Sequence, residues 1–205
     1  FISIQANVIE RDIVSFVEDA QQAIDNNIQL PSGYFTTWGG QYRLQQEANK
    51  RLAIVIPVTL LIISLLLYSS FGSFKNATLI LLNIPLALVG GVIALWISGQ
   101  NLSVPASVGF IALFGIALEN GMVLMTYLNQ LVRQGVAIDE ASIQAACLRV
   151  RPVLMTAVTT ALGLIPLLLA TGTGSEVQKP LATVVVGGLV TSTLLTLLVI
   201  PALYK

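Results

Sequence analysis

The chain has 205 residues, of which 55% are hydrophobic and 10% are charged; its formal net charge is zero and it contains no histidine. Soluble domains carry about 25% charged residues, so this composition excludes an ordinary soluble domain. The lack of a basic tract argues against nucleic acid as a partner, and the single cysteine, Cys147, excludes an internal disulfide. Without histidine, the sequence offers no recognisable spacing for a resident metal site.

The charged side chains are unevenly distributed. Residues 1–51 hold half of them, although they make up only a quarter of the chain. This asymmetry predicts a small soluble-type segment, 1–51, followed by a membrane domain, 52–205. The chain begins inside a strand-like run at Phe1, without a signal peptide, so we interpret it as the C-terminal fragment of a longer protein.

The first segment has the pattern of an α+β piece. Residues 1–8 alternate apolar and polar side chains, which is typical of a strand. Residues 11–27 have apolar side chains at the spacing of an amphipathic helix. Residues 30–42 place turn residues around a second predicted strand. Since strand, helix and strand are too short to bury a core alone, we expect them to complete a larger domain.

Long apolar segments follow, and each has the length of a membrane span. About 20 helical residues cross a bilayer core about 30 Å thick. The segments predict a membrane all-α bundle of five transmembrane helices, at residues 52–71, 77–97, 105–130, 152–171 and 181–203. The glycine pairs at 90–91 and 187–188 are expected to allow close helix packing.

Basic residues orient the spans. If residues 1–51 lie outside, the loops and tail on the other side carry five basic residues, whereas the opposite short loops carry only Lys179. This excess predicts a cytoplasmic C-terminus, with residues 172–180 facing the periplasm or exterior. Residues 139–148 are predicted to form a short helix on the cytoplasmic surface, with Cys147 as a packing residue.

Glu119 is the only charged residue within the five predicted spans. A charge at mid-membrane costs about 2.5–3.5 kcal/mol on insertion scales, and burial favours the protonated carboxyl group. One interpretation is a proton carrier; the other is a protonated acid that donates one interhelical hydrogen bond. Helical spacing puts Glu119 on a face with small and weakly polar neighbours. In the next span, Thr156, Thr159, Thr160 and Gly163 form a stripe whose hydroxyl groups either approach such a carboxyl or bond to their own helix.

Three stretches together resemble the resistance-nodulation-division transporters: residues 109–128, 149–189 and 194–204. The details, including "ATGTGSEVQKPLATVVVGG" and the earlier "LPSGYFTTWGGQY", are similar to the heavy-metal efflux branch. The resemblance covers essentially the whole chain. It implies the end of the last periplasmic porter subdomain and the last five of twelve transmembrane helices.

The resemblance also assigns residues to a proton relay. The multidrug branch has Lys-Asn where this chain has Glu119 and Asn120, and that lysine works with two aspartates of helix four. Thr156 and Arg149 fall on positions that assist the relay in multidrug pumps. Copper and silver exporters have a lysine at the position of Val153, so its absence here favours divalent ions such as zinc, cobalt, nickel or cadmium.

The resemblance therefore implies a proton antiporter rather than an enzyme. It implies a homotrimer in the bacterial inner membrane that expels metal ions with a periplasmic adaptor protein and an outer-membrane channel. No cofactor is expected, because the metal ion is the substrate and the proton gradient supplies the energy. Three alternatives stay open: a multidrug pump of the same superfamily, a proton-driven protein-translocation or lipid-handling factor with the same membrane fold, and a purely structural membrane module.

Overall fold

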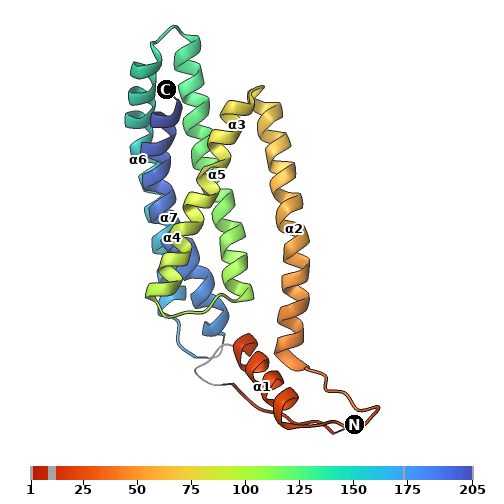
Figure 1. Cartoon of the computed structure of the whole chain (residues 1–205). Coiled ribbons are helices and arrows are strands. Elements are labelled where there is room, and N and C mark those ends of the chain that lie inside the picture. Colours follow the sequence, from red (N-terminus) through yellow and green to blue (C-terminus); the bar gives the residue numbers. More distant parts are fainter. Residues whose placement is uncertain (1, 9–12, 173, 205) are drawn as a thin grey trace. The chain divides into compact units, whose positions relative to one another are not determined.

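The computed structural model describes residues 2–8, 13–172 and 174–204 (Figure 1). The chain divides into two compact units, Phe1–Val55 and Ile56–Lys205, and each is described by itself.

In the first unit, α1 spans Ile13–Asn27, as the apolar spacing predicts, and buries Val17. The two predicted strands are not formed, and the described residues contain no strand. Residues 2–8 have no regular structure, and Ile2 and Ile4 are 93% and 91% exposed. A strand needs a neighbour for its backbone N–H and C=O groups, and the described residues up to 51 supply none. In place of the expected α+β piece, the described part of this segment contains α1, the start of α2 and no strand.

The rest of the chain forms long helices. Five helical segments are long and apolar enough to cross a membrane, which confirms the predicted number of candidate spans. They are α2 (Gly40–Phe71), α3 (Phe74–Leu81) with α4 (Asn83–Ile97), α5 (Val104–Arg133), α6 (Ile138–Leu169) and α7 (Ser175–Tyr204).

Local sequence signals explain where these helices begin and break. Ser73 and Ser103 cap the starts of α3 and α5, because their side chains accept hydrogen bonds from the N–H groups of the third residue along. Gly135, with φ at 87°, ends α5 in the left-handed region that glycine tolerates. Pro85 lacks an N–H group, which leaves the Leu81 carbonyl without its helical partner where α3 gives way to α4.

Residues 139–148 form the first turns of α6, which continues without a break to Leu169 and contains Pro152 and Pro166. The sequence separates this stretch from the following span, whereas the structure joins the two in one helix. That its first turns lie along a membrane surface stays a prediction.

The core of the second unit lies where α7 packs against α4, α5 and α6 (Figure 1). The closest approach is between α4 and α7. A Cβ atom at Gly90 would lie 2.7 Å from the Gly187 carbonyl oxygen, and one at Gly187 would lie 2.9 Å from that of Gly90. Small residues allow helices in membranes to approach until their backbones touch. The glycine pairs therefore serve close helix packing.

Candidate functional site

Glu119 lies on the face of α5 that turns away from the core. The residues that share this face by helical spacing are all exposed: Ala112, Gly115, Glu119, Met122 and Thr126. The opposite side of α5 packs inward through residues such as Leu113, Leu124 and Leu128, each 0% exposed. Within the described residues, the Glu119 carboxyl group has no hydrogen-bond or ion-pair partner. The site is thus open on this side.

Helix α6 runs antiparallel to α5 and contacts it (Figure 1). Their register is marked by Arg149, whose guanidinium carbon lies 5.5 Å from the centroid of the Tyr127 ring. Because the helices are antiparallel, seven residues forward from Arg149 on α6 correspond to seven residues back from Tyr127 on α5. Each step of seven residues is about 10 Å at 1.5 Å per residue, so Thr156 lies at the level of Asn120. Thr156 and Glu119 therefore lie at the same depth on neighbouring helices.

The hydroxyl groups near this level bond to their own helices. Thr156 donates to the Val153 carbonyl at 2.9 Å, and Thr159 donates to that of Met155 at 2.7 Å. With its hydrogen committed, each hydroxyl oxygen is left as an acceptor. A threonine that donates to its own helix can still accept a hydrogen bond from a protonated carboxyl group. The bonds within α6 are therefore compatible with an interaction between these threonines and Glu119.

The glycines on these two faces leave room for a further element. A Cβ atom at Gly115 or at Gly163 would meet no atom within 4 Å. In contrast with the glycines of the α4–α7 contact, these two have no neighbour within the described residues. The faces of α5 and α6 that carry Glu119 and Thr156 are accordingly uncovered.

Asn120, unlike Glu119, lies on the buried side of α5. It is only 7% exposed, and its Nδ2 atom has no hydrogen-bond partner in the described part of the chain. The next residue, Gly121, packs against Asn83 of α4, whose Nδ2 atom would lie 2.7 Å from an added Cβ. Asn120 therefore belongs to the packed interior with α4, whereas Glu119 belongs to the open face.

Sequence reasoning missed a buried polar group near Asn120. Asn83 is 1% exposed, and its Nδ2 atom also lacks a partner among the described residues. On α7, the hydroxyl groups of Ser192, Thr193 and Thr196 are buried in the same way. An amide inside an apolar span was the available signal, since a buried polar side chain is costly without a partner.

Arg149 does not contact Glu119. Its partner, Tyr127, lies eight residues beyond Glu119 on α5, or about 12 Å along the helix axis. Glu119 and Thr156 thus lie at the same depth on neighbouring helices, and Asn120 lies in the packed interior. Arg149 lies about two helical turns away from Glu119. Among the residues that the structure describes, no group of three His, Cys, Asp or Glu side chains is placed to hold a metal ion.

Comparison with known proteins gives consistent matches. Residues 1–205 match the AcrB/AcrD/AcrF family. The chain is 55% identical over 204 residues to Protein HelA of Legionella pneumophila, with 99% of this chain and 19% of HelA covered. It is 50% identical over 204 residues to the cobalt-zinc-cadmium resistance protein CzcA of Cupriavidus metallidurans, with 100% of this chain and 19% of CzcA covered.

A crystal structure of a heavy metal efflux pump superposes on this chain with a TM-score of 0.83 and 46% sequence identity, covering 97% of this chain and 20% of that one. The chain therefore spans about a fifth of the length of the proteins it matches. With a family match over its whole length and five apolar helices, this chain is part of a multi-pass membrane protein and belongs to the AcrB/AcrD/AcrF family.

Proposed function

We propose that the full-length protein is a proton-driven exporter of heavy-metal cations of the resistance-nodulation-division class, a secondary transporter rather than an enzyme. Its relatives support this: one is a cobalt-zinc-cadmium resistance protein and another a heavy metal efflux pump. The proposed substrates are divalent ions such as zinc, cobalt, nickel or cadmium. Val153, in place of the lysine of copper and silver exporters, favours this choice.

One observation carries the proposal: Glu119, the only charged residue within the five spans predicted from the sequence, stands on an open helix face. An ionisable residue inside a membrane is costly and is by default a sign of function. A carboxyl group there can take up a proton from one side and release it to the other. Thr156, at the same depth and with its own hydrogen already donated, offers an acceptor that suits the protonated state of Glu119.

Protonation of Glu119 would then move α5 and α6 against the helices that cover their open faces in the full-length protein. A neutral carboxyl group donates a hydrogen bond, whereas a carboxylate only accepts one, so its preferred partners change with the proton. Asn120, buried on the packed side of α5, tunes the hydrogen bonds around the site. Arg149, in the first half of α6, contacts the Tyr127 ring of α5 and supports the mouth of the path.

The proposed assembly is a homotrimer in the bacterial inner membrane, with the C-terminus in the cytoplasm. Residues 1–51 complete a periplasmic porter subdomain, where strands of the remaining chain pair with residues 2–8 and with the stretch around Tyr34. A periplasmic adaptor and an outer-membrane channel complete the export path. No resident cofactor is proposed, because the metal ion is the cargo.

The test is transport by the full-length protein in proteoliposomes with an imposed proton gradient. Zinc, cobalt, nickel, cadmium and copper are offered separately, together with one organic cationic dye. Proton flux driven by at least one divalent metal, and not by the dye, is the expected result. Flux with the dye alone would favour the multidrug alternative. Flux with none of these would leave a translocation or lipid-handling factor as the better account.

A further inference from the structure

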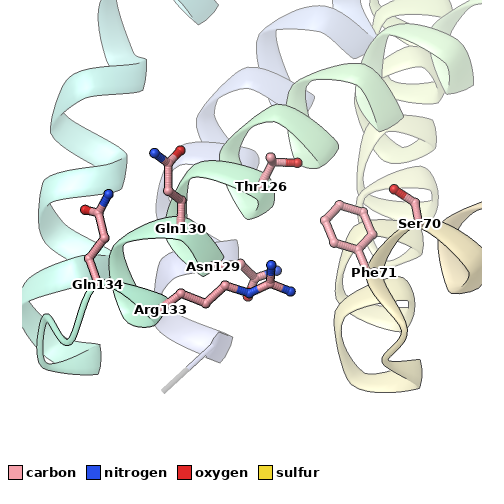
Figure 2. Close-up of a pocket in the computed structure, with 7 residues that line it drawn as sticks. All are labelled: Ser70, Phe71, Thr126, Asn129, Gln130, Arg133 and Gln134. Carbon is pink, nitrogen blue, oxygen red and sulfur yellow. The ribbon is translucent and has the colours of Figure 1, made fainter.

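A pocket of about 330 Å³ lies between the ends of α2 and α5, away from Glu119 (Figure 2). Ser70 and Phe71 line it from α2, and the last two turns of α5 form the other wall. Figure 2 shows the Arg133 side chain reaching from α5 toward Ser70 and Phe71. Apart from Phe71, all of its lining residues are polar or basic, and none is a carboxylate.

Arg133 is an unpaired cation in this pocket. No carboxylate within the described residues pairs with its guanidinium group. Arginine presents a planar fork of donors that matches the oxygen atoms of a phosphate. The pocket thus supplies a charge and a donor geometry whose natural complement is a bound anion.

Asn129 adds an oriented donor. Its Oδ1 atom accepts hydrogen bonds from the Tyr204 hydroxyl at 2.7 Å and from Asn76 Nδ2 at 3.4 Å. Both acceptor positions of this amide oxygen are therefore occupied. The Nδ2 atom, which has no partner among the described residues, is left to donate into the pocket that Asn129 lines.

Hydrogen bonds at the end of α5 reduce the repulsion that its last carbonyl groups exert on an anion. The N–H of Gln134 donates to the Gln130 carbonyl at 3.1 Å, and those of Gly135 and Val136 donate to Val132 and Leu131 at 3.0 and 3.2 Å. These bonds satisfy carbonyl groups that carry the negative end of the helix dipole.

The pocket lies at the level expected for lipid headgroups. Both helices that line it end here, and Tyr68 and Phe74 stack beside the turn with ring centroids 4.2 Å apart. Phe74 is 72% exposed, and Lys75 donates a hydrogen bond to the Tyr204 carbonyl at 3.2 Å. Exposed aromatic and basic side chains at helix ends mark the membrane–water interface.

An apolar track leads from the pocket toward the middle of the membrane. One and two turns before Ser70, on the same face of α2, lie Leu66 and Ile62, which are 63% and 51% exposed. A molecule with a phosphate in the pocket and an acyl chain along this track would satisfy both surfaces.

We propose that this pocket binds the headgroup phosphate of an anionic phospholipid. Arg133 holds the phosphate oxygens, Asn129 Nδ2 and the Ser70 hydroxyl add neutral hydrogen bonds, and the acyl chain covers Leu66 and Ile62. Basic pockets between transmembrane helices are recognised sites for anionic headgroups. The lipid bridges the ends of α2 and α5 across the pocket, and this role is independent of metal transport.

The test is lipid retention by the full-length parent protein, measured by native mass spectrometry after stepwise removal of phosphatidylglycerol or phosphatidylcholine. We expect Arg133→Gln to bind phosphatidylglycerol about tenfold more weakly than the parent. Arg151→Gln is the matched control, because it removes the same charge from an exposed position of α6 outside the pocket. Arg133→Lys keeps the positive charge but loses the planar guanidinium group, so its binding of phosphatidylglycerol should fall between that of the parent and that of Arg133→Gln. The lysine variant also tests the proposal if Arg133→Gln does not assemble.

Two results would overturn the proposal. Equal retention of phosphatidylglycerol by the parent and both Arg133 variants would mean that no lipid occupies the pocket. The same result is expected if another segment of the longer protein fills the pocket. Displacement of the lipid by millimolar inorganic phosphate would identify a site for free anions instead. Since no metal or proton gradient is present, neither result bears on the role of Glu119.

Discussion

The contact between α4 and α7 predicts the effect of a single methyl group. In Gly187→Ala, the new Cβ atom would collide with the Ala94 side chain and would lie 2.9 Å from the Gly90 carbonyl oxygen. The helices must separate to accept it. Overpacking of this kind costs about 1–3 kcal/mol, and a gap of about 1 Å forfeits a quarter to a half of each dispersion contact. We expect the variant to unfold at a lower temperature than the parent protein.

The assay is thermal unfolding of the full-length protein in detergent, with the fraction of assembled protein as a second readout. Ala94→Gly removes the Cβ atom with which the new methyl group collides but leaves the Gly90 carbonyl oxygen in place, so the double variant should recover part of the loss. Gly39→Ala is the control, because a Cβ atom there has no neighbour within 4 Å. If Gly187→Ala unfolds at the parent temperature, or the double variant is no more stable than the single one, the proposed close packing is wrong.

Three further experiments test other parts of the structure. Arg149→Ala should lose about 0.5–1 kcal/mol of stability with its cation–π contact, and a double-mutant cycle with Tyr127→Leu should show that the two losses are not additive. Asn83→Leu should be nearly neutral or stabilising in thermal unfolding, because the buried Nδ2 atom has no partner among the described residues; a large loss would reveal an unseen bond. Cys147 is exposed, so in a full-length variant in which every other cysteine is replaced by serine it should react with an impermeant maleimide in inside-out vesicles but not in intact spheroplasts.

Composition and hydropathy predicted the membrane helices because the length of an apolar segment reflects the thickness of a bilayer. The glycine pairs at 90–91 and 187–188 were read as packing positions, and both lie in close contacts. The strands near residues 1–8 and 30–42 were not found, because strand formation depends on partners that alternation within one segment does not supply.

The candidate site could be predicted in part. A lone acid among apolar residues marks Glu119 from the sequence alone, and helical spacing gives its face. The sequence could not show that Asn120, one residue later, turns to the opposite environment, because that depends on which side of α5 meets α4 and α7. Nor did it reveal the pocket at Arg133, whose walls are about 60 residues apart in the chain.

The central claim is that Glu119 carries the coupling proton. The most direct measurement is metal-driven proton flux by the full-length protein and its Glu119→Gln variant in proteoliposomes, because glutamine keeps the shape of the side chain but cannot release a proton. Glu140→Gln is the matched control, since this glutamate is exposed and its carboxylate accepts a hydrogen bond from Gln144 of its own helix at 3.1 Å. We predict that Glu119→Gln assembles normally and loses the flux, while Glu140→Gln retains it. Normal flux in an assembled Glu119→Gln variant would contradict this role and leave Glu119 as a group that only donates or accepts a hydrogen bond between helices of the full-length protein.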